Sequence, residues 1–180
     1  MRKTKMIFVC LLLLVAACLW GQIDLQQAVN KLIENARIAA DSVHYSEDVR
    51  RKAVRTGLEH LGEIFAAGRD GLPYLHLLIT EHWQEFNPKD QILEYSIARM
   101  GKIANYDQEM IKSLLPLLED AQYPFRSIKG PILGVLQKSP DLQFKYDTYM
   151  NILLNSNDKR LKSRAFSMLG VDDLFPISSK

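Results

Sequence analysis

Apolar residues recur at three- and four-residue spacing along almost the whole chain from Ile23 to Gly170. This spacing aligns apolar side chains on one face of an α-helix, and no stretch shows the strict alternation that is typical of a half-buried strand. The pattern therefore predicts an all-α protein. Eight helices are expected, near residues 24–41, 47–66, 72–86, 88–104, 107–119, 124–137, 140–155 and 158–169.

Polar residues at the predicted helix starts are candidate N-caps. Ser46 precedes two acidic residues, and Asn87 and Ser139 each precede a proline, which is favoured at the first helical position. Asn157 is expected to cap the last helix. Since the connections are short, neighbouring helices should pack antiparallel.

A leucine or methionine followed by glycine recurs in four predicted helices, within the segments LGEI, MGKI, LGVL and LGVD. The glycines, Gly62, Gly101, Gly134 and Gly170, are 39, 33 and 36 residues apart. Modestly varying spacings of this size are typical of a helical solenoid with two helices in each unit.

The apolar faces of these helices agree in phase for two copies and differ in the third. The glycine lies beside the face in the first two copies and is displaced by one position in the third, and the fourth copy is too short to compare. The predicted faces are Val54, Leu58, Leu61 and Phe65; Leu93, Ile97, Met100 and Ala104; and Phe125, Lys129, Ile132 and Leu136.

Helix pairs with leucine-proline-leucine in the first helix, and Asp-x-Arg followed by Leu-Gly in the second, resemble HEAT repeats. SLLPLLEDAQYPFRSIKGPILGVL resembles one whole unit, and SEDVRRKAVRTGLEHLGEI resembles the second helix of another. The resemblance implies a short right-handed helical-hairpin solenoid of about four repeats over residues 24–170, in which Pro116 lets a leucine-rich first helix bend. Pro73 lies near its helix start and is not equivalent to Pro116, so a plain helical bundle is the alternative.

The first residues have the layout of an export signal: Arg2, Lys3 and Lys5 precede an apolar run over residues 6–20. VAAC, at residues 15–18, resembles the lipobox of bacterial lipoproteins, which implies cleavage before Cys18 and a lipid on its sulfur. Cleavage after Gly21, giving a soluble protein, and an uncleaved membrane anchor are the alternatives. The expected divisions are an export signal (1–17), a linker (18–23), the repeat domain (24–170) and a tail (171–180), in a periplasmic or membrane-anchored lipoprotein.

The cysteine count and the net charge limit which crosslinks and which partners are expected for the mature domain. Cys10 and Cys18 are the only two cysteines, so no disulfide is expected beyond the leader. Removal of three leader cations reduces 23 basic residues to 20, against 21 acidic residues. A nearly neutral body argues against nucleic acid as a partner, because phosphate binding requires a basic footprint.

Candidate chemistry is sparse. His76 and His82 are six residues apart and fall on different helix faces, and His60 with Glu59 and Glu63 lacks the three or four convergent ligands of a metal site. No phosphate loop or hydrolase motif is present. The basic run at residues 50–55 shares its helix with acidic residues, which favours intrahelical pairing. We expect neither a catalytic site nor a metal or cofactor.

The leading hypothesis is a noncatalytic scaffold or adaptor that binds a protein in the cell envelope. An enzyme or small-ligand protein with a hidden site, and a structural envelope component, are the alternatives, and the oligomeric state is left open. In HEAT-like solenoids the second helices line the inner side, so superposing the second and fourth helices implies one binding ridge. Its candidate residues are His60, Glu63, Tyr95, Arg99 and Lys102.

Overall fold

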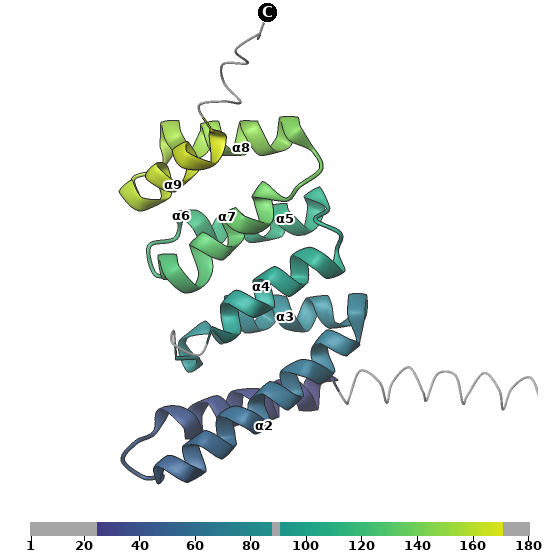
Figure 1. The fold of residues 1–180 in the computed structure, drawn as a ribbon, viewed down its shortest axis with the longest axis vertical. Coiled ribbons are helices and arrows are strands. Elements are labelled where there is room, and N and C mark those ends of the chain that lie inside the picture. Colours follow the sequence, from purple (N-terminus) through teal and green to yellow (C-terminus); the bar gives the residue numbers. More distant parts are fainter. Residues whose placement is uncertain (1–24, 88–90, 171–180) are drawn as a thin grey trace, which may run out of the picture. The chain divides into compact units, whose positions relative to one another are not determined.

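The computed structural model of the protein describes residues 25–87 and 91–170 (Figure 1). These ranges consist of helices joined by turns and contain no strand, which confirms the all-α prediction. The predicted export signal, Cys18, the linker and the tail lie outside them. The chain divides into two compact units, Met1–Tyr74 and Leu75–Lys180. A single repeat domain over residues 24–170 stays a prediction.

In the first unit, a helix at residues 25–40 is followed by α2 (Glu47–Ala66) and the 3₁₀ helix η1 (Gly68–Gly71). Ser46 caps α2 as predicted, its side chain accepting the N–H of Val49. The two helices approach at Gly57, where a Cβ would lie 3.4 Å from Cδ1 of Leu32. This contact rotates the buried face of α2 away from the predicted one. Leu58 is 45% exposed, and the buried residues are Ala53, Gly57, Leu61 and Ile64.

η1 brings the chain back against α2. A Cβ added to Gly71 would lie 2.2 Å from the backbone oxygen of Ile64, far inside van der Waals contact. Only glycine therefore fits this position without a shift of the backbone.

The second unit contains most of the remaining elements, beginning with α3, which crosses the boundary between the units. They are α3 (Leu72–Thr80), η2 (Trp83–Glu85), α4 (Ile92–Ile103), α5 (Gln108–Leu114), α6 (Pro116–Glu119), the π-helical turn η4 (Phe125–Lys129), α7 (Gly130–Gln137), α8 (Leu142–Asn155) and α9 (Lys159–Leu169).

Several predicted helix starts are displaced in the structure. α4 begins at Ile92, after Gln91 in the left-handed region (φ 56°), and Asn87 does not cap it. Ser139 does not cap α8, because its hydroxyl accepts the N–H of Asp141 at 3.3 Å and Asp141 is the cap. Asp158, one residue beyond Asn157, caps α9. In both helices an aspartate is the N-cap, in place of the serine or asparagine predicted from the sequence.

The hydrogen-bond ladder of the leucine-rich helix predicted over residues 107–119 is interrupted at Leu115, although Leu115 keeps helical backbone angles (φ −58°, ψ −37°). α5 ends at Leu114, and Pro116 is the first residue of α6. Pro116 has no N–H to bond the carbonyl of Lys112, which instead accepts the N–H of Leu115 at 3.3 Å. Apolar side chains on both sides of the break are buried, including Leu114 and Leu118. Packing therefore continues across the break.

The helix predicted over residues 124–137 begins with a π-helical turn. The N–H of Gly130 donates to the carbonyl of Phe125, five residues back, and the N–H of Lys129 donates to that of Pro124 at 3.3 Å. Pro131 follows and has no N–H to continue an α-helical ladder. A wide turn therefore replaces the predicted first α-helical turn.

α7 is buried over a wider arc than predicted, at Ile132, Leu133, Val135 and Leu136. Because Leu133 is buried, the residue before Gly134 lies in the core, as does the residue before each of the other three glycines. Ile132 and Leu136 of the predicted face are buried as well, so the displacement of the third copy by one position stays a prediction.

Within the second unit, α7 contacts α4, α5 and α9, and α8 packs against α9 (Figure 1). α4, α7 and α9 thus form one row of neighbouring helices. The approach of α4 to α7 is close, since a Cβ on Gly101 would lie 2.9 Å from the ring of Tyr106 and 3.1 Å from Cγ1 of Val135.

Candidate functional site

Two of the histidines, His44 and His60, each lie against a single carboxylate. His60 is 15% exposed, and its Nδ1 lies 3.3 Å from Oε2 of Glu63. His44 contacts Asp41 at 2.7 Å. Over the described ranges, no three His, Cys, Asp or Glu side chains meet in a way that could hold a metal ion.

The basic run on α2 forms intrahelical ion pairs, as predicted. Arg51 pairs with Glu47, and Arg55 pairs with Glu59 at 3.6 Å, both at four-residue spacing. Such exposed pairs contribute little to stability, typically about 0.3–0.5 kcal/mol each. Arg51 and Arg55 therefore belong to a solvated helix face, whereas Ala53 of the same run is buried.

The predicted ridge residues fall into two sets. Tyr95 is 57% exposed and shares the solvent-facing side of α4 with Arg99 and Lys102. His60 and Glu63 contact each other on α2, in the first unit. A ridge that joins the two sets stays a prediction.

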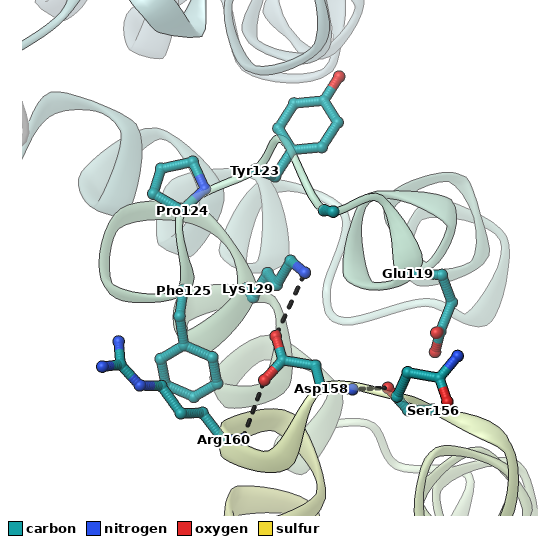
Figure 2. A pocket seen from close by; sticks show the side chains of 10 residues that line it. Glu119, Tyr123, Pro124, Phe125, Lys129, Ser156, Asp158 and Arg160 are labelled. Carbon is teal, nitrogen blue, oxygen red and sulfur yellow. Dashed lines mark hydrogen bonds and ion pairs between the residues drawn. The ribbon is translucent and has the colours of Figure 1, made fainter.

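A pocket of about 500 Å³ lies between the end of α6, η4 and the start of α9 (Figure 2). Its polar centre is Lys129, whose side chain is only 4% exposed. Nζ of Lys129 lies 3.4 Å from Oδ2 of Asp158. Figure 2 shows these two side chains directed toward each other, whereas the ring of Tyr123 is directed away from them.

Asp158 combines a helix cap with this ion pair. Its Oδ1 accepts the N–H groups of Arg160 at 2.9 Å and Leu161 at 3.1 Å. Burial raises the pKa of Asp158, but the N–H groups of Leu161 and Arg160 and the ammonium of Lys129 outweigh burial and hold the pKa below its ordinary value. The ionised carboxylate thus joins η4 to the N-terminus of α9. The ion pair and the two cap hydrogen bonds are the contacts of a structural link between two segments.

A second depression, here called the α7 groove, runs along the row of α4, α7 and α9 and has a volume of about 550 Å³. Small and apolar residues occupy much of it. They are Ala98, Phe125, Gly130, Pro131, Gly134 and Val135. No heavy atom lies within 4 Å of a Cβ built on Gly134, so the groove is open above this position.

Charged residues at the α7 groove are Glu94 from α4, Arg126 from η4, Lys138 after α7 and Arg164 from α9. Phe125 and Arg164 also line an adjoining depression of about 430 Å³ on α9, together with Lys159 and Arg160. The two depressions therefore form one continuous surface.

The residues predicted for the ridge on α4 border this surface, whereas its centre was not predicted from the sequence. On the helical period, Tyr95 and Lys102 lie beside Ala98, so the α4 set borders the α7 groove. The missed signal was the segment KGPILG, in which Gly130 and Gly134 are four residues apart on one helix face.

In comparisons with known proteins, no protein-family model, no curated protein and no solved structure matches the chain. Within the described residues, no helix has both the length and the apolar character needed to cross a membrane.

Proposed function

We propose that the protein is an exported, noncatalytic helical-repeat protein that binds another protein as a scaffold or adaptor in the cell envelope. The observation that carries this proposal is the row of α4, α7 and α9, along which one continuous groove faces solvent. Helical-repeat proteins bind partners through extended surfaces of this kind without catalytic groups.

Two features support stacked helix pairs, the arrangement expected of the right-handed solenoid of about four HEAT-like repeats that we propose. The row alternates along the chain with α5 and α8, as expected when the second helix of each pair stacks on the next. The residue before each glycine of the four-fold motif is also buried, namely Leu61, Met100, Leu133 and Leu169.

The proposed location rests on the export signal and the VAAC segment. Lipidation at Cys18 would hold the repeat domain at a membrane surface, since several acyl chains anchor firmly where one chain does so only marginally. Cys18→Ala should abolish fatty-acid labelling and either release the protein from membranes or stall its processing. Normal processing of a wild-type protein that carries no lipid would refute the anchor.

Partner capture tests the binding function. The mature protein would be crosslinked in its own cells, purified, and analysed for specific partners. Tyr95→Ala with Arg99→Ala should reduce capture without changing the melting temperature, whereas Lys31→Ala on the first helix serves as the control. Failure of the wild-type protein to capture any specific partner would count against the proposal.

A further inference from the structure

We infer that the α7 groove and its extension on α9 bind an acidic, extended segment of the partner protein, anchored by an apolar side chain over Gly134. This inference rests on the proposed function and specifies the chemistry of the partner. Three properties of the surface support the inference: its positive charge, the apolar floor of the α7 groove and the concave shape of that groove.

The surface is strongly basic although the mature chain is nearly neutral. Among the described residues, one acidic side chain, that of Glu94, lines it. Five cationic side chains line it, namely Arg126, Lys138, Lys159, Arg160 and Arg164. Among the residues that the structure describes, none of these five makes an ion pair with a carboxylate. Carboxylates of a partner are the complement that such a surface lacks.

The floor of the α7 groove is suited to apolar side chains. Gly130 and Gly134 expose helix backbone on one face, and Pro131 and Val135 flank them. A Cβ built on Gly134 meets open space, so an apolar side chain of the partner can approach the helix backbone there. Aromatic Phe125 lies where the two depressions meet, and the ammonium of Lys138 lies 5.7 Å from the ring centre of Tyr106.

These features favour a peptide over a nucleic acid or an anionic membrane. Nucleic acids are bound mainly through rows of phosphate contacts, and anionic membranes through dense polybasic clusters. Here the cations border a concave, partly apolar floor, which matches recognition of a peptide by main-chain and side-chain contacts in a groove. The cationic side chains attract the acidic peptide, and the apolar side chain over Gly134 fixes its position in the groove.

Fluorescence anisotropy of labelled peptides on the full mature chain tests the inference. The probe is a peptide about ten residues long that contains four Asp or Glu and two Leu residues, and its control carries Asn and Gln at the acidic positions. The acidic peptide should bind at least about tenfold more tightly than its amide control, with affinity that falls as salt rises. Equal binding of the two peptides would overturn the inference.

Variants locate the binding. Arg126→Glu with Arg164→Glu should weaken acidic-peptide binding at least about tenfold, whereas Lys31→Glu with Lys52→Glu makes the same change in net charge in the first unit and should not. Gly134→Leu should block the anchor. Gly62→Leu is its matched control, because Gly62 is also helical and has no heavy atom within 4 Å of its Cβ position.

Other occupants give different results. Tighter binding of a single-stranded oligonucleotide or of anionic vesicles than of the acidic peptide would overturn the inference in favour of those ligands. The acidic tail of the chain itself is another possible occupant, and its competition would be relieved in the variant Asp172→Asn with Asp173→Asn. Tighter peptide binding by this variant would assign the groove to the tail and overturn the inference. If the captured partner is retained by the Arg126 and Arg164 variant, the inference fails while the proposed function survives.

Discussion

Nζ of the buried Lys129 lies 3.4 Å from Oδ2 of Asp158, a residue 29 positions later that also caps α9. The same carboxylate therefore neutralises a lysine of one helical segment and satisfies the N-terminal N–H groups of another. The two partners are unequal, because Lys129 is almost fully buried and the Asp158 side chain is 32% exposed.

This inequality predicts that the two partners differ in their effect on stability. Asp158→Ala removes a cap and leaves a buried ammonium unpaired, and it should lower the free energy of unfolding by about 2–4 kcal/mol. Lys129→Met leaves Asp158 with its two N–H donors and should cost less than about 1 kcal/mol. Urea denaturation measures both. Equal losses in the two variants would contradict the assigned roles, and Asp158→Ala combined with Lys129→Met should recover part of the loss.

Asp158 also predicts a pH dependence. Its pKa is lowered in the folded state from 3.8, so the carboxylate contributes stability above the unfolded pKa and loses it as pH falls through the folded pKa. The difference in free energy of unfolding between wild type and Asp158→Asn should be constant from neutral pH to about 5 and should shrink below about 3.8. Lys129→Met should keep most of this dependence, because the N–H groups of Leu161 and Arg160 remain. A difference that grows with acidity would contradict the prediction.

Two glycines of the first unit should respond oppositely to alanine. Gly71→Ala would place a Cβ 2.2 Å from the carbonyl oxygen of Ile64, and it should destabilise the protein by about 2–4 kcal/mol. Gly62→Ala meets no atom and should stabilise it by roughly 0.5–1 kcal/mol through helix propensity. Thermal unfolding of the two variants beside wild type checks both signs. A tolerated Gly71→Ala would show that η1 can move away from α2.

The core prediction concerns the buried residues of the repeated motif. Leu61→Ala and Met100→Ala should each cost on the order of 2–5 kcal/mol, because both side chains are buried. Leu58→Ala serves as the control, since Leu58 is 45% exposed and its truncation should cost less than about 1 kcal/mol. A large loss at Leu58 would restore the face predicted from sequence.

The positions of the helices were predictable because the spacing of apolar residues and the residues that begin and end helices are local properties of the sequence. α2 occupies residues 47–66 as expected, and all four residues of the face predicted for α4 are buried. Two prolines produced the main errors. Pro116 interrupts the hydrogen-bond ladder of a predicted helix, and Pro131 follows a π-helical turn. The apolar pattern did not indicate either feature, because apolar side chains on both sides of each proline are buried whether or not the backbone ladder is continuous.

The candidate site was less predictable, because it depends on which helices become neighbours. Tyr95, Arg99 and Lys102 share a face through the helical period alone. The meeting of Arg126 and Arg164 at one groove depends on the packing of η4 and α7 against α9, which no local pattern specifies. The role of Lys129 was also missed, since its position on an apolar face gave no indication of a partner 29 residues away.

The short elements in the middle of the second unit have a consequence for the order of folding. α5, α6, η4 and α7 have 7, 4, 5 and 8 residues, whereas isolated helices below about 12–15 residues are marginal in water. α4 and α8, with 12 and 14 residues, are closer to forming by themselves. We expect the middle segments to become ordered late, on a nucleus supplied by their neighbours, so that substitutions there have low φ-values and mainly accelerate unfolding.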